Sequence, residues 1–145
     1  MKRILVATDG SETADRAVKY AAHLAKTIGS ELVIANVIGG YGMPTELLEK
    51  FAAGKDVWIN ESLAALSAQT LAVARDCART LGVSTILLES RAGSVAETIV
   101  EIAKEKGVDA IVIGKRGASG IGRMLLGSIS NKLVSLAPIP IIVVP

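Results

Sequence analysis

The sequence predicts an α/β protein in which an open, doubly wound, five-stranded parallel sheet carries helices on both of its faces. Three observations predict this fold. Short, wholly apolar runs alternate along the chain with longer segments whose apolar residues recur at helical spacing. The apolar runs lack a polar face, which is typical of parallel strands covered on both sides. The regular alternation of strand and helix favours right-handed crossovers within a single sheet.

The N-terminal part of the chain predicts a strand, a helix and a second strand. The run Ile4–Ala7 is apolar throughout and ends at a turn signal. Over Glu12–Lys26 the apolar residues take helical spacing, with Ser11 placed to cap the helix and Gly29 placed to end it. The second strand is expected over Glu31–Ile38.

The middle of the chain predicts mainly one long helix. The stretch Gly39–Pro44 breaks regular structure, and a short helix is expected over Thr45–Phe51. The long helix is expected over Val57–Leu81, where Gly82 ends it. One stripe of this helix is expected to pack on the sheet. It consists of Leu63, Leu66, Thr70, Val73, Cys77 and Leu81.

In the C-terminal part of the chain, strands and helices are again expected to alternate. A third strand is expected over Thr85–Glu89, and Ser94–Glu97 matches a capping box that opens the next helix. The inward residues of that helix are expected to be Val95, Ile99, Ile102 and Ala103, with Gly107 as its stop. The remaining elements are expected to be a strand over Ala110–Ile113, a helix over Ser128–Leu136 and a strand over Ile141–Val144.

Ligands of such sheets bind beyond the carboxyl ends of the strands, where the strand order reverses. This rule singles out the loops that follow the first, second and fourth strands. They are Thr8–Ser11, Ile38–Pro44 and Gly114–Ser128.

Composition limits the classes of function. A chain of 145 residues suits a single domain over 1–145. Aromatic residues make up 3% and the net charge is +2 without a run of like charges, so no nucleic-acid partner is expected. One cysteine (Cys77) and one histidine (His23) exclude a disulfide framework and a Cys/His metal cluster. We expect no signal peptide and no membrane association, and hence a cytoplasmic protein.

The segment Gly114–Ser130 carries the strongest functional signal. Glycines at 114, 117, 120, 122 and 127 let backbone N–H groups approach an anion closely. Gly127-Ser128 opens a helix whose positive end favours phosphate, and Arg116 and Arg123 can add charge. The segment lacks the lysine of a Walker loop, and the first strand is not followed by a Gly-x-Gly-x-x-Gly turn.

The spacing Gly114-x2-Gly117-x9-Gly127-Ser128, with the opening segment Val6–Ser11 and the terminal strand after Pro140, resembles the ATP-binding branch of the universal stress protein family. The resemblance covers essentially the whole chain. Val95 departs from it, because the family usually has proline there. The stretch from 39 to 56 lies where the family is variable, so no role is carried over to it.

The resemblance implies that the chain binds ATP together with Mg²⁺ or Mn²⁺; no residue is assigned to the metal. Asp9 would lie beside the ribose or adenine, although it could instead simply cap the first helix. Val37 would bind adenine through its backbone. The base and ribose would be contacted by Ala7, Thr8, Asp9, Val37, Ile113 and Gly114, and the phosphates by Gly117, Gly127, Ser128 and Ser130, with Ile129 beside them.

The sequence therefore predicts an ATP-binding regulatory or stress-response protein and not an enzyme. The glycine segment holds no acidic residue and the chain has no second histidine, so no general base is evident and any hydrolysis should be slow. Two alternatives stay open. One is a nucleotide-free dimeric adaptor of the same fold, and the other is an enzyme that acts at the α-phosphate of an adenine nucleotide.

The last strand, Ile141–Val144, is hydrophobic, flanked by prolines and expected at an edge of the sheet. An edge of this kind can pair with a second copy of itself. The sequence, like the family resemblance, therefore predicts a homodimer through this strand.

Overall fold

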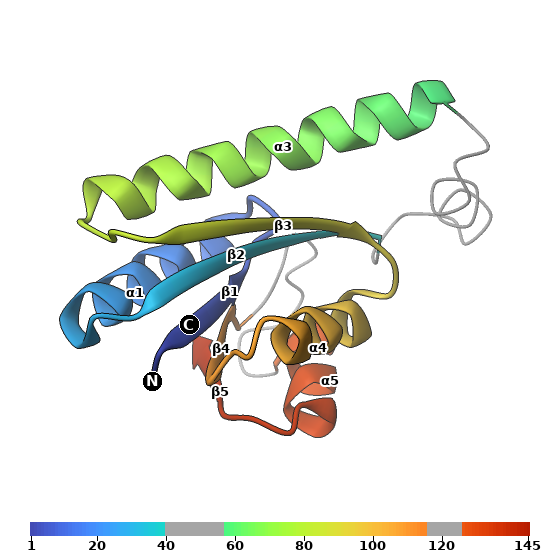
Figure 1. The fold of residues 1–145 in the computed structure, drawn as a ribbon. Helices are drawn as coiled ribbons and strands as arrows, with labels where there is room; N and C mark the ends of the chain where they lie inside the picture. Colours follow the sequence, from blue (N-terminus) through green and yellow to red (C-terminus); the bar gives the residue numbers. More distant parts are fainter. Residues whose placement is uncertain (40–56, 116–125) are drawn as a thin grey trace.

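The computed structural model describes residues 1–39, 57–115 and 126–145 (Figure 1). The helix expected over Thr45–Phe51, together with Gly117, Arg116 and Arg123, lies outside the described residues. The strands are β1 (Arg3–Ala7), β2 (Glu31–Ile38), β3 (Ile86–Ala92), β4 (Ala110–Gly114) and β5 (Ile141–Val144). The helices are α1 (Glu12–Ile28), α3 (Val57–Thr80), α4 (Val95–Glu105) and α5 (Ser128–Leu136).

The strands form one five-stranded sheet in the order β3-β2-β1-β4-β5, and all neighbouring pairs are parallel. The chain runs outward from β1 to β3 and then returns to β4 on the other side of β1, so the winding direction reverses between β1 and β4. This confirms the predicted doubly wound parallel sheet. The loops that follow β1 and β4 lie at the point where such sheets form a ligand crevice.

Helices cover both faces of the sheet (Figure 1). Helices α1 and α3 enclose one layer of the core, which includes Ile4 and Val6 of β1. Helices α4 and α5 enclose the other layer, which includes Leu5. We call these the α1/α3 layer and the α4/α5 layer. Within the described part of the chain, no helix combines the length and the hydropathy needed to cross a membrane.

The predicted ends of α1 are confirmed, whereas the capping box of α4 is not formed. Ser11 Oγ accepts a hydrogen bond from the Ala14 N–H at 3.3 Å, and Gly29 ends the helix with φ 70°. At α4, the Ser94 hydroxyl donates to the Glu97 carboxylate at 2.7 Å and makes no hydrogen bond to the helix backbone. The prediction was wrong here because the charged side chain took the hydroxyl group that was expected to cap the backbone.

Strand β3 extends three residues beyond the predicted end at Glu89. Ser90 and Arg91 continue the ladder opposite Asn36 and Val37 of β2. In the sequence, these polar residues are not typical of a buried strand. Since β3 lies at an edge of the sheet, polar side chains are compatible with its pairing.

The stripe of α3 that packs on the sheet differs from the predicted one. Leu66 and Val73, which were expected to face the core, are 61% and 62% exposed. Cys77 and Leu81 of the predicted stripe do pack against the α1/α3 layer, but the buried stripe consists of Ser67, Leu71, Ala74 and Ala78. It lies one residue further along the chain than the predicted stripe, which rotates the helix by about 100°. Three of these four residues are small, so the helix can approach the sheet closely.

Leu71→Ala and Leu66→Ala together test this orientation of α3. Leu71→Ala empties a packed position and should lower the free energy of unfolding by about 2–4 kcal/mol. Leu66→Ala alters an exposed position of the same helix and should stay within about 0.5 kcal/mol of the parent. Urea unfolding measures both values. Equal losses for the two variants would contradict the orientation.

Candidate functional site

The predicted site residues that the structure describes come from four chain segments at the carboxyl ends of the strands. They are the loop that follows β1, the end of β2, the end of β4 and the first turn of α5. The loop after β1 is bound to β2 by the hydrogen bond from the Thr8 N–H to the Ala35 carbonyl, at 2.9 Å. The first turn of α5 is bound to the end of β4 through Ser130. The structure thus brings these segments together, while Gly117 lies outside its described residues.

The loop that follows β1 is held by its own side chains. The Thr8 hydroxyl oxygen accepts a hydrogen bond from the Gly10 N–H at 3.1 Å, and the Asp9 carboxylate accepts one from the Ser11 N–H at 2.9 Å. Gly10 has φ 80°, a left-handed conformation that favours glycine. Thr8 is buried, whereas Asp9 is exposed at the start of α1. Asp9 therefore presents a carboxylate at the carboxyl end of β1 and also orders the turn before α1.

The backbone of Val37 faces the space beyond the end of β1. The Ala35 carbonyl points toward β1, because it accepts the hydrogen bond from Thr8. Successive residues of a strand direct their backbone groups alternately to the two neighbouring strands, so Val37 directs its N–H and C=O to the same side as Ala35. Strand β1 ends at Ala7, which is opposite Ala35. A planar ring that carries both a donor and an acceptor could bind Val37 there.

Ala7, Val37 and Ile113 meet in the α4/α5 layer. Ile113 is part of its buried core, and Ala7 and Val37 pack against that core while keeping part of their surface exposed. The side chains predicted to surround the base therefore form one apolar surface. It lies beside the backbone groups of Val37.

Gly114 has a structural reason to be glycine. A Cβ atom at this position would lie 2.8 Å from Thr13 Cγ2 and 3.0 Å from the Thr13 carbonyl carbon and oxygen. These distances leave no room for a side chain between β4 and the first turn of α1. The role in ligand contact that the sequence suggested for Gly114 stays a prediction, but close packing already accounts for the residue type.

The first turn of α5 has open backbone donors near the carboxyl end of β4. The Gly127 carbonyl accepts the first intrahelical bond, from the Asn131 N–H at 2.9 Å, while the Gly127 N–H donates to the Lys115 carbonyl at 2.8 Å. Among the described residues, the N–H groups of Ser128, Ile129 and Ser130 have no acceptor. A helix start that lacks a side-chain cap favours an anion, because these donors and the helix dipole point outward.

Ser128 and Ser130 have different environments. The Ser128 side chain is exposed at the helix start. Ser130 is buried, and its hydroxyl donates to the Gly114 carbonyl at 2.8 Å and the Lys115 carbonyl at 3.1 Å. The hydroxyl proton of Ser130 therefore fastens α5 to β4. A phosphate contact by Ser130, as predicted from the sequence, would use its backbone N–H group.

One charged pair near the start of α5 was missed by the sequence reasoning. Lys132 Nζ lies 2.5 Å from Glu97 Oε1, and Ser94 donates to the other carboxylate oxygen. The Lys132 ammonium group and then the Ser94 hydroxyl lower the pKa of Glu97 to about 2. This pair joins the first turn of α4 to the second turn of α5. Spacing could not reveal it, because the two residues belong to different elements.

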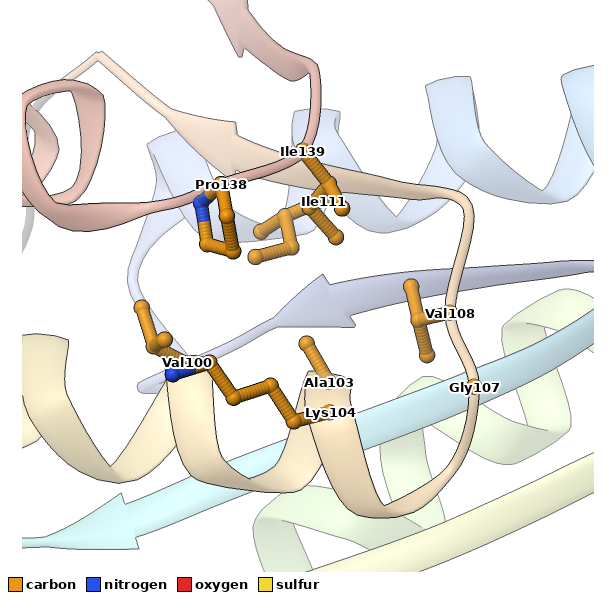
Figure 2. Close-up of a pocket in the computed structure, with 8 residues that line it drawn as sticks. All are labelled: Val100, Ala103, Lys104, Gly107, Val108, Ile111, Pro138 and Ile139. Atoms are coloured by element: carbon orange, nitrogen blue, oxygen red, sulfur yellow. The ribbon is translucent and has the colours of Figure 1, made fainter.

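An apolar pocket of about 180 Å³ lies elsewhere in the molecule, between α4 and the segments that precede β4 and β5 (Figure 2). It is therefore at the amino-terminal edge of the sheet, opposite the candidate site. None of the predicted site residues lines it. Its lining residues are Val100, Ala103, Lys104, Gly107, Val108, Ile111, Pro138 and Ile139. Within the described residues, no group of three His, Cys, Asp or Glu side chains could hold a metal ion.

Known proteins resemble this chain along its whole length. A family model described as the universal stress protein family matches residues 1–145. The universal stress protein YxiE of Bacillus subtilis is 34% identical, over 98% of this chain and 97% of that protein. The structure of universal stress protein UspA from Lactobacillus plantarum is 26% identical with a TM-score of 0.80, over 99% of this chain and 97% of that one. A universal stress protein in complex with cAMP is 25% identical with a TM-score of 0.70, over 99% and 95% of the two chains.

The Glu97–Lys132 pair predicts a specific dependence of stability on pH. The folded state lowers the Glu97 pKa from 4.5 to about 2, so the pair stabilises the fold above pH 4.5. This contribution is lost as the pH falls through that range toward 2. Urea unfolding should therefore show Glu97→Gln less stable than the parent at neutral pH, with the difference closing near pH 2.

Glu101→Gln provides the matched control. Glu101 is an exposed carboxylate of the same helix and forms no ion pair with a described residue. Its substitution should leave the pH dependence unchanged. The assignment is wrong if Glu97→Gln keeps the full pH dependence of the parent.

Proposed function

The chain belongs to the universal stress protein family, and from this premise we propose that it is a cytoplasmic regulatory protein that binds ATP together with a divalent ion. The nucleotide would lie across the carboxyl ends of β1 and β4. The observation that carries the proposal is the first turn of α5, whose backbone donors have no acceptor among the described residues at the point where the strand order reverses. A ligand with an anionic group satisfies them.

The base end of the site favours adenine. The backbone groups of Val37 offer one donor and one acceptor, which match the ring nitrogen and the exocyclic amine of adenine. Ala7 and Ile113 supply an apolar surface beside them. Asp9 is the carboxylate nearest to this point in the loop after β1, and a ribose hydroxyl is a suitable donor to it. The related universal stress protein in complex with cAMP, itself an adenine nucleotide, supports an adenine nucleotide as the ligand.

The phosphate end depends on backbone groups more than on charged side chains. The N–H groups of Ser128, Ile129 and Ser130 and the Ser128 hydroxyl can bind phosphate oxygens. The spacing of Gly114, Gly117, Gly127 and Ser128 supports ATP over a nucleotide with fewer phosphates, because it marks the ATP-binding branch of the family that the chain resembles.

We propose that bound ATP acts as a regulatory ligand, with hydrolysis slow at most. The single histidine, His23, is an exposed residue of α1. The carboxylate of Asp9, in the loop after β1, already accepts a hydrogen bond from the Ser11 N–H. Rapid turnover needs a positioned base or water-orienting group. Binding would then shift a conformational or assembly equilibrium.

Gly127→Asp tests the site. Gly127 has φ −59°, which any residue can adopt, and aspartate is a favoured residue at a helix start, so the variant should fold. Its carboxylate would occupy the open N–H groups and repel phosphate. We expect Mg²⁺-ATP to bind at least about tenfold more weakly in calorimetry.

Ser135→Asp is the control, since it adds the same charge at an exposed position near the other end of α5. It should bind ATP like the parent. Extraction of the purified parent with acid would reveal any adenine nucleotide that co-purifies. The site assignment fails if parent and Gly127→Asp bind equally, or if the parent binds no nucleotide, as a nucleotide-free adaptor would.

We also propose that the protein forms a homodimer through β5. This strand lies at the edge of the sheet. The Pro140 and Val144 carbonyls accept hydrogen bonds from the β4 side, so by alternation Ile141 and Val143 direct their backbone groups outward. Next to β5, α5 exposes Val134 and Leu136. An apolar surface beside open backbone groups suits pairing with a second copy.

Val143→Pro tests this dimer. Proline removes the outward N–H of Val143 while keeping an apolar side chain, and it is tolerated at a strand edge that faces away from the sheet. We expect the parent to be a dimer in sizing with light scattering and Val143→Pro to be a folded monomer. A monomeric parent at high micromolar concentration would contradict the proposal, as would a variant that remains dimeric.

A further inference from the structure

The loop that follows β1 is linked to helix α3 by a chain of buried polar groups. Asn36 Nδ2 donates to the Thr8 carbonyl at 2.8 Å, and Asn36 Oδ1 accepts a hydrogen bond from Ser67 Oγ at 2.7 Å. The hydroxyl oxygens of Ser67 and Ser90 lie 2.6 Å apart. Thr8, Asn36 and Ser67 are 5%, 9% and 3% exposed. The chain therefore runs through the protein interior from the proposed base end of the site to α3, and it ends at Ser90, an exposed residue of β3.

Asn36 occupies a position where the fold itself favours an apolar residue. The preceding residues on this face of β2, Leu32 and Ile34, are wholly buried in the α1/α3 layer. A buried amide is tolerated only when its donor and acceptor are both bonded. Here the Asn36 amide nitrogen binds the Thr8 carbonyl in the loop after β1, and the Asn36 amide oxygen binds Ser67 of helix α3. Asn36 also directly precedes Val37, whose backbone faces the proposed base.

Helix α3 reaches the same loop at a second point. A Cβ atom at Gly10 would lie 3.6 Å from Thr70 Cγ2, so the Thr70 side chain is close to Gly10. Residues three apart on a helix share a face, and Ser67 and Thr70 therefore approach the loop side by side. Figure 1 shows α3 running along β3 and β2 on this side of the sheet.

We propose that Asn36 and Ser67 are positioning residues for the nucleotide, and that they couple its binding to helix α3. The inference rests on the proposed function. The Asn36 amide holds the Thr8 carbonyl, and with it the loop that presents Asp9, in the conformation that accepts the base and ribose. Ser67 orients the amide. Because coupling between two sites is reciprocal, bound nucleotide stabilises α3 to the same extent that α3 favours binding.

The first experiment compares Ser67→Ala with Ser30→Ala. Ser30 is also buried, and its hydroxyl donates to the Met1 carbonyl at 2.8 Å, but it lies at the amino end of β2, away from the site. Both variants lose one buried serine hydroxyl and should lose similar stability toward urea. In calorimetry with Mg²⁺-ATP, Ser67→Ala should bind about tenfold more weakly than the parent, while Ser30→Ala should bind like the parent.

Two further variants define the chemistry of the positioning. Asn36→Asp replaces the donor to the Thr8 carbonyl with a carboxylate oxygen and should weaken binding at least as much as Ser67→Ala. Ser67→Thr keeps the hydroxyl and should restore most of the affinity. Equal weakening by Ser67→Ala and Ser30→Ala would show a general effect of stability and would overturn the inference.

Hydrogen exchange supplies a readout that a purely structural role would leave unchanged. In the parent and Ser30→Ala, Mg²⁺-ATP should slow exchange in α3 around Ser67 as well as in the first turn of α5. In Ser67→Ala, saturating nucleotide should still protect α5 but no longer α3. A parent that binds no nucleotide would refute the proposed function and this inference together. If the parent binds nucleotide, and Ser67→Ala and Asn36→Asp both show the same affinity and the same protection of α3 as the parent, this inference alone would be refuted.

Discussion

Helix α1 packs so tightly against the end of β4 that position 114 has no room for a side chain. The nearest Thr13 atoms would lie 2.8–3.0 Å from a Cβ atom there. The contact brings the loop after β1 against the end of β4, which is where the strand order reverses. It also leaves the Gly114 carbonyl within reach of the Ser130 hydroxyl, so α5 is fastened to the same point. The absence of a side chain at Gly114 therefore allows α1, the end of β4 and the start of α5 to lie close together.

The crevice is ordered by the hydrogen bonds of the protein itself. Thr8 and Asp9 close the loop after β1, Ser130 holds the start of α5, and Asn36 and Ser67 support the loop from the α3 side. For the described segments, binding would lose little conformational entropy, because these hydrogen bonds already hold them in place. The N–H groups at the start of α5 differ from these segments, because in the proposed complex an anion would complete their hydrogen bonding. Ordered surroundings with open donors suit retention of a nucleotide better than its rapid conversion.

The two faces of the sheet have different relations to the site. On the α4/α5 side, Ala7, Val37 and Ile113 contribute apolar packing at the site, and the Glu97–Lys132 pair joins α4 to α5. On the α1/α3 side, polar groups connect the loop after β1 to helix α3 through Asn36. A long helix joined to the crevice by directional hydrogen bonds can respond to a ligand, since hydrogen bonds lose strength steeply when their geometry changes.

Sequence reasoning predicted the order of strands and helices, the parallel sheet and the position of the glycine segment, because periodicity, turn residues and motif spacing are local properties. It misplaced the packed stripe of α3: small residues such as Ala74 and Ala78 carry little hydropathy signal, and only the close approach of helix and sheet selects them. It missed the extension of β3 and the Glu97–Lys132 pair. It also could not show that Ser130 donates to β4 or that Asn36 joins Thr8 to Ser67. Those contacts join residues far apart in the chain and form only when the folded chain brings its elements together.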